Sequence, residues 1–128
     1  MRVADAMNPQ VLTVGPNHTL RDVARRMAER RVGAAVVVDP ENGIGIITER
    51  DLLESVAAGQ DPDGEMVSNH LTKDLVYAAP EWDLEQAASA MVRGGFRHLV
   101  VVSGNDVVGI LAMRDIVRSW VTAGAVAR

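Results

Sequence analysis

Two similar stretches decide the fold: Gly45-Ile46-Ile47-Thr48-Glu49-Arg50-Asp51 and Gly109-Ile110-Leu111-Ala112-Met113-Arg114-Asp115. They lie 64 residues apart. In each, a short apolar run typical of a buried strand passes directly into a segment patterned as a helix. Unpaired backbone N–H groups and the positive end of the helix dipole converge at such a junction, which is therefore suited to hold phosphates and ribose hydroxyls.

Thr48 and Asp51 also have the spacing of a helix capping box, in which a threonine begins the helix and an acidic residue three positions later reaches back to it. Starting a helix is the commoner use of a Thr-x-x-Asp pattern. Capping alone and ligand binding are therefore both open interpretations of these two residues.

The whole chain repeats with the same 64-residue shift and without a gap. Such self-similarity indicates two copies of one structural unit. Thirteen pairs of residues are identical, and most are apolar residues or glycines that packing explains. The pairs Arg50/Arg114 and Asp51/Asp115 recur although they are charged, which packing does not require.

Each half is predicted to fold as a β-α-β-β-α unit of the mixed α/β (α+β) class. Apolar residues at i, i+3, i+4, i+7 and i+8 predict helices starting at Leu20 and Leu84, which we expect to end at Val32-Gly33 and at Gly94-Gly95. Val-rich runs joined by short turns predict a hairpin after each helix, followed by a second helix.

A unit of about 60 residues is marginally stable alone, so we expect the two copies to pack against each other. The turn-rich segment between them is short and polar. We place the first repeat at residues 1–60, the linker at 61–66, the second repeat at 67–124 and a tail at 125–128.

Composition narrows the function classes. The net charge of −4 and the pI near 5.3 argue against nucleic-acid binding, and 3% aromatic residues leave few rings for stacking bases. Cysteine is absent, and His18, His70 and His98 have neither metal-ligand spacing nor a recognisable catalytic partner. No run approaches the ~18 apolar residues of a membrane span, and no signal peptide is recognisable. We expect a cytoplasmic protein that is not an enzyme and holds no metal.

The tandem units, each with a Gly-apolar-x-Thr/Ser-x-x-Asp stretch entering its last helix, resemble a pair of cystathionine-beta-synthase (CBS) domains, also called a Bateman module. The resemblance covers essentially the whole chain. It implies two repeats related by a pseudo-twofold axis, with a cleft that commonly binds AMP, ADP, ATP, S-adenosylmethionine or NAD. No cofactor is required. Such pairs usually form homodimers, and head-to-head or head-to-tail pairing is left open.

The resemblance also implies roles for particular residues. Asp51 and Asp115 accept hydrogen bonds from ribose hydroxyls, and Thr48 contributes near the ribose and phosphate. Ala112 departs from the pattern, because it has no hydroxyl. The remaining candidate ligand-binding residues are Gly33, Arg50, Arg97, His98 and Arg114.

Arg97 and His98 stand at the start of the predicted central strand, where the first copy has Gly33-Ala34. The residues alone favour an exposed strand start without function, whereas the resemblance favours contacts to phosphate. We expect two unequal sites, the tighter one combining Thr48 and Asp51 with Arg97 and His98 across the cleft.

Two functions are consistent with these residues. The first is a regulatory module that binds an adenine nucleotide and signals through dimer geometry or partner binding. The alternative is a ligand-free scaffold that dimerises and docks to an unidentified protein. Apolar residues near the end, such as Trp120 and Val121, motivate the dimer, although they also fit packing within one protomer.

Overall fold

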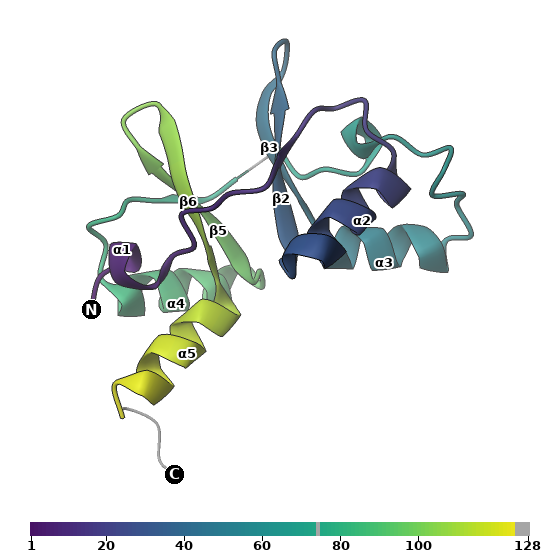
Figure 1. The fold of residues 1–128 in the computed structure, drawn as a ribbon. Coiled ribbons are helices and arrows are strands. Elements are labelled where there is room, and N and C mark those ends of the chain that lie inside the picture. The colour runs from purple at the N-terminus through teal and green to yellow at the C-terminus, as the bar shows by residue number, and fades with distance from the viewer. Residues whose placement is uncertain (74, 125–128) are drawn as a thin grey trace. The chain divides into compact units, whose positions relative to one another are not determined.

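The computed structural model describes residues 1–73 and 75–124, so the predicted tail at 125–128 lies outside the described residues. Its elements, in chain order, are α1 (Val3–Ala6), β1 (Thr13–Val14), α2 (Leu20–Arg30), β2 (Ala34–Asp39), β3 (Gly43–Thr48), α3 (Glu49–Ala57), η1 (Val67–Asn69), β4 (Tyr77–Ala78), α4 (Leu84–Gly94), β5 (His98–Ser103), β6 (Asp106–Ala112) and α5 (Met113–Thr122) (Figure 1). They form two compact units. Unit 2 is Leu12–Leu75, and unit 1 combines Met1–Val11 with the chain from Val76 onward.

Unit 2 contains a three-stranded sheet in the order β1-β2-β3, with β1 parallel and β3 antiparallel to β2. α2 begins as predicted, because Thr19 Oγ accepts a hydrogen bond from the Asp22 N–H at 3.2 Å. Its stripe of Leu20, Val23 and Met27 is buried in the core of the unit. These positions are the apolar stripe expected from the helical spacing.

The predicted end of α2 at Val32-Gly33 is wrong by a few residues. α2 ends at Arg30, and Arg31 takes the left-handed conformation with φ 55° and ψ 42°. Its N–H turns back to the carbonyls of Ala28 and Met27, which closes the helix before Val32. In unit 1 the equivalent position is Gly95, and α4 ends there as predicted, with φ 71°.

Unit 1 repeats the same sheet in the order β4-β5-β6. Its hairpin differs in one detail, a register shift between Val101 and Val102. This irregularity leaves Val101 paired with Gly109, as Val37 is paired with Gly45 in unit 2. The glycines of the two deciding stretches therefore keep the same place in both sheets.

The first segment of each sequence repeat belongs to the compact unit that is formed mainly by the other repeat. Val3 of α1 and Val67 of η1 are an identical pair, and each is 0% exposed in the core of the unit it joins. Val3 N–H donates to the Trp82 carbonyl at 2.8 Å, and Val67 N–H donates to the His18 carbonyl at 2.9 Å. Each repeat thus completes the core of the other. The predicted boundaries of the two repeats in the sequence stay a prediction, because the compact units divide the chain at other residues.

A glycine permits each exchanged segment to lie close against the last strand of the unit that it joins, which is β3 in unit 2 and β6 in unit 1. Ile46 exchanges backbone hydrogen bonds with Thr72 at 2.9 and 3.0 Å, and Ile110 exchanges the same pair with Asn8. A Cβ at Gly45 would stand 3.0 Å from the Thr72 carbonyl oxygen, and one at Gly109 would stand 3.1 Å from that of Asn8. This close approach explains why the Gly45/Gly109 pair recurs.

The predicted linker at residues 61–66 packs against the start of α2, within unit 2. The N–H groups of Leu20 and Arg21 donate to the carbonyls of Glu65 and Pro62, and the Arg21 side chain pairs with Asp63. Asp63 raises the pKa of Arg21 above its ordinary value by hydrogen bonding and by charge.

Within residues 1–73 and 75–124, no helix is long and apolar enough to cross a membrane.

We predict that Gly109→Ala destabilises the fold by about 1–3 kcal/mol, as overpacking of a close contact does. The new Cβ would lie 2.7 Å from the Met7 sulfur and 3.1 Å from the Asn8 carbonyl oxygen, so the Met7 side chain must shift and the backbone at Asn8 must give way slightly. Gly64→Ala is the matched control, because its Cβ would meet only ordinary contacts, the nearest at 3.5 Å. Urea unfolding checks this, and equal midpoints for the two variants would contradict it.

Candidate functional site

The two deciding stretches form equivalent strand-to-helix junctions, one in each unit. In unit 2, β3 ends at Thr48 and α3 begins at Glu49. Thr48 donates its N–H to Asp51 Oδ2 at 2.8 Å and its hydroxyl to the same oxygen at 3.1 Å. In return, the Asp51 N–H donates to Thr48 Oγ at 3.4 Å. The capping interpretation of this pair is therefore confirmed.

The junction of unit 1 keeps only half of this arrangement. The Ala112 N–H donates to Asp115 Oδ2 at 2.9 Å, but Ala112 has no side-chain oxygen to accept from the helix. Its backbone still has the extended conformation of a cap residue, with φ −97° and ψ 152°. The side chain of Asp115 is 13% exposed, and Arg118 Nη1 lies 3.9 Å from its Oδ1.

The start of the central strand lies directly beside each junction. The Gly33 carbonyl accepts the Glu49 N–H at 2.9 Å, and the Arg97 carbonyl accepts the Met113 N–H at 2.8 Å. His98 is paired in register with Ala112 across the ladder. Unit 1 therefore places the backbone of Arg97 and His98 beside the junction at which the helix of Asp115 begins.

The two junctions differ in local charge. In unit 2 the carboxylate of Glu49 lies beside Gly33, where an added Cβ would stand 3.1 Å from Glu49 Oε1. In unit 1 the corresponding residues are Met113 and Arg97. A phosphate near Gly33 would meet Glu49, and a phosphate near Arg97 would meet a guanidinium. Sequence reasoning missed Glu49, and the available signal was that the aligned copies differ at this position, with Met113 in the second copy.

The other predicted site residues have different surroundings. Arg50 is 79% exposed and its Nε lies 3.3 Å from Glu54 Oε1, one turn along α3. This ion pair directs Arg50 along the helix surface. Thr48 and Asp51 belong to unit 2, while Arg97 and His98 belong to unit 1. Their predicted combination in one site stays a prediction.

Comparisons with known proteins address the family. The CBS domain model matches residues 3–58 and 67–121, which together make up most of the chain. The chain belongs to the CBS domain family. It is 37% identical over 115 residues to the CBS domain-containing protein YhcV of Bacillus subtilis, an alignment that covers 89% of this chain and 81% of that protein.

Solved structures of CBS proteins have the same fold. A CBS domain protein from Pyrobaculum aerophilum, complexed with AMP, is 28% identical with a TM-score of 0.81, over 95% of this chain and 99% of that chain. A hexameric CBS-CP12 protein from bloom-forming cyanobacteria is 28% identical with a TM-score of 0.86, over 91% of this chain and 66% of that chain. The predicted fold, a tandem pair of CBS repeats in the mixed α/β class, is confirmed.

We predict that Ala112→Ser stabilises the fold by about 0.5–1 kcal/mol, because the new hydroxyl can accept a hydrogen bond at the start of α5. Thr48→Ala makes the opposite change at the equivalent CBS junction and should cost about 1 kcal/mol. Chemical unfolding of the two variants beside the parent measures both effects. A destabilising Ala112→Ser would show that the unit 1 junction does not tolerate a cap.

Proposed function

We propose that this CBS pair is a regulatory module that binds an adenine nucleotide of the AMP, ADP or ATP type. One observation carries the proposal: each CBS unit places an aspartate, Asp51 or Asp115, in the first turn of a helix that directly follows a strand. A similar CBS protein is complexed with AMP. S-adenosylmethionine and NAD share the adenosine group and are tested beside the nucleotides.

The capping hydrogen bonds leave further acceptor positions on the carboxylates of both aspartates. Thr48 directs both of its hydrogen bonds to Oδ2 of Asp51, and Ala112 directs its one bond to Oδ2 of Asp115. An ionised carboxylate has two oxygens and about four acceptor positions. Vicinal ribose hydroxyls can therefore donate to a carboxylate that the helix already holds in place. In this proposal the cap orients the ligand contact and does not compete with it.

Arg97 and His98 supply the phosphate contacts in this proposal. The guanidinium of Arg97 offers a planar set of donors suited to phosphate, and Arg97 is exposed. His98 is half-buried beside it at the start of β5. Gly33 leaves the corresponding place in unit 2 without a cation, and Glu49 stands there instead. Two sites of unequal affinity follow from this difference.

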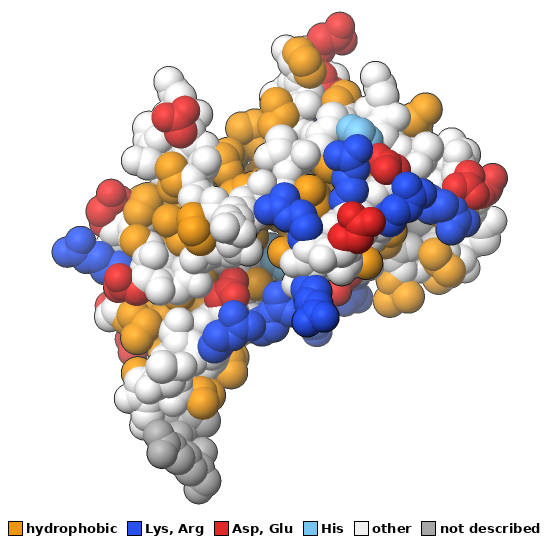
Figure 2. Space-filling view, viewed as in Figure 1, with side chains coloured by type: hydrophobic (Ala, Val, Ile, Leu, Met, Phe, Trp, Pro, Cys, Tyr) orange, Lys and Arg blue, Asp and Glu red, His pale blue; other side chains and the backbone are white. Residues whose placement is uncertain are grey.

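We also propose that the chain forms a homodimer and signals by a change in dimer geometry or in binding to another protein. Hydrophobic side chains reach the surface over α3 and over α5 (Figure 2), where Leu53 is 67% exposed and Val121 is 49% exposed. Trp120, which the sequence placed with Val121, packs instead against the core of unit 1, because it follows Ile116 by one turn. A ligand that binds one dimer geometry more tightly shifts the population toward it.

We predict that at least one of AMP, ADP, ATP, NAD or S-adenosylmethionine raises the melting temperature. A ligand at 100 times its Kd adds about 2.7 kcal/mol to the stability of the folded state, which corresponds to several degrees. Differential scanning fluorimetry with this panel is the measurement. No shift with any of the five would contradict the proposal and favour the ligand-free scaffold.

Asp51→Asn is the matched variant for that panel. Asparagine can still accept the Thr48 N–H, so stability should change by less than about 1 kcal/mol, while loss of a charged acceptor should weaken binding roughly tenfold. Asp115→Asn reports on the other junction in the same way. Calorimetry gives the affinities, and an Asp51→Asn variant that only melts earlier supports capping alone.

We predict that Arg97→Ala weakens AMP or ATP binding by roughly tenfold or more, as loss of a charge-assisted hydrogen bond does. Adenosine has no phosphate and should bind both proteins alike. Combining Arg97→Ala with Asp51→Asn and, separately, with Asp115→Asn tells which carboxylate belongs to the same ligand, since paired contacts are not additive. Unchanged AMP affinity in Arg97→Ala would rule out its phosphate role.

For the homodimer we expect a sedimenting species of twice the 13.7 kDa chain mass at micromolar concentration. Leu53→Asp should dissociate it, because a charge would replace an apolar side chain at the contact. Val76→Asp, at another exposed apolar residue (47% exposed), is the control away from α3 and α5. A monomer across the micromolar range contradicts the homodimer.

A further inference from the structure

The surfaces of α3 and α5 both carry exposed apolar side chains. Leu53 and Val56 of α3 are 67% and 65% exposed, and Val117 and Val121 of α5 are 46% and 49% exposed. Leu53 and Val117 are equivalent residues of the two repeats. Apolar side chains one turn apart on a helix form a stripe that a second helix can cover. The two helices therefore present similar stripes, each on its own unit.

The residue after each of these equivalent apolar residues reverses its charge. Glu54 follows Leu53, and Arg118 follows Val117, and the two charged side chains are each 67% exposed. The whole helices differ in the same sense. α3 carries Glu49, Arg50, Asp51 and Glu54, a net charge of −2, whereas α5 carries Arg114, Asp115 and Arg118, a net charge of +1.

The neighbouring helices repeat the reversal at one position only. Over their whole lengths α2 carries a net charge of +2 and α4 a net charge of 0, so the charge contrast at the contact is local to single residue pairs. α2 packs beside α3 in unit 2, and α4 packs beside α5 in unit 1. Glu29 on α2 corresponds to Arg93 on α4, and both are exposed. Each follows an exposed apolar residue, Ala28 or Val92. A third reversed pair, Arg21 and Glu85, does not add to the contrast, because Arg21 is ion-paired with Asp63 inside unit 2.

We propose that the two copies of the homodimer meet through unlike helices, with α3 of one copy against α5 of the other. This inference rests on the proposed homodimer and is independent of nucleotide binding. A contact of α3 with a second α3 would bring glutamates together, and a contact of α5 with a second α5 would bring arginines together. The unlike contact sets Glu54 near Arg118 beside a shared apolar stripe, and a twofold axis produces it twice per dimer.

The local ion pairs of these residues do not remove the preference. Glu54 lies 3.3 Å from Arg50 on its own helix, and Arg118 lies 3.9 Å from Asp115. The Glu54–Arg50 pair lies on exposed helix surface, where such pairs are weak. Arg118 is itself 67% exposed and lies at long range from Asp115, which is 13% exposed. Arg50 and Arg114 are the same in both repeats, so they contribute equally to like and unlike contacts. The difference between the two arrangements comes from Glu54 and Arg118, with Glu49 adding a further negative charge on α3.

The test is charge reversal measured by analytical ultracentrifugation at low salt. Glu54→Arg makes both contact surfaces basic and should raise the dimer Kd by about tenfold, since two contacts per dimer change from attraction to repulsion. Arg118→Glu should do the same from the acidic side. The double variant Glu54→Arg/Arg118→Glu exchanges the signs and should return the Kd to within about threefold of the parent. Higher salt should shrink every difference.

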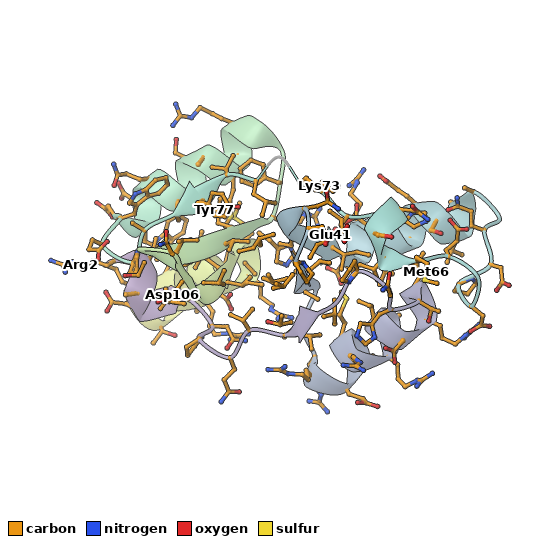
Figure 3. All side chains as sticks on the ribbon, turned by 90° about the horizontal axis from the view of Figure 1, so that it is seen from above. Arg2, Glu41, Met66, Lys73, Tyr77 and Asp106 are labelled. Carbon is orange, nitrogen blue, oxygen red and sulfur yellow. The ribbon has the colours of Figure 1, made fainter. Side chains whose placement is uncertain are left out.

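Glu41→Arg is the matched control, because it makes the same charge change at the exposed turn of the β2–β3 hairpin (Figure 3). Its dimer Kd should stay within about threefold of the parent. Circular dichroism melts confirm that each variant folds. A parent dimer whose Kd is unchanged by Glu54→Arg overturns the unlike contact and leaves the homodimer standing. A parent that is monomeric overturns both, while AMP calorimetry on the same samples reports on nucleotide binding separately.

Discussion

The close approach of two backbones at Gly45 and Gly109 is the constraint on which the rest of the structure depends. At each glycine a segment from the other repeat crosses the outer strand and exchanges two backbone hydrogen bonds with the following isoleucine. A side chain there would push the crossing segment away. The crossing delivers Val3 and Val67 to their cores, so neither repeat buries its own core residues alone. Each compact unit therefore contains core residues from both repeats.

The same strands then lead into the helices that carry the candidate site. Asp51 and Asp115 are fixed by hydrogen bonds from the residues that begin α3 and α5, so their carboxylates are oriented before any ligand arrives. Preorganised acceptors avoid the entropy cost of ordering a flexible side chain on binding. The capping bonds use one carboxylate oxygen, Oδ2, of each aspartate, so capping by itself does not exclude the proposed ribose contact.

The sequence predicted most of the fold because helix and strand periods are local properties. The gapless shift of 64 residues, the caps at Thr19 and Asp83, and both hairpins follow from patterns within a few residues of each other. The end of α2 was misjudged because Arg31 adopts a left-handed conformation that favours glycine and asparagine over arginine. Local propensity does not predict such a conformation for arginine, because the tertiary fold sets the path of the chain from α2 into β2.

For the site, the sequence by itself determined the residue types and their asymmetry, Thr48 against Ala112 and Gly33 against Arg97. Only the tertiary structure decided which of these residues lie beside the same strand-to-helix junction. It set Arg97 and His98 beside the junction of Asp115, and Glu49 beside Gly33, because backbone hydrogen bonds join the start of each central strand to the start of the helix 16 residues later. Repeat symmetry gives the pairs that correspond, whereas contact between them depends on long-range pairing that no local pattern specifies.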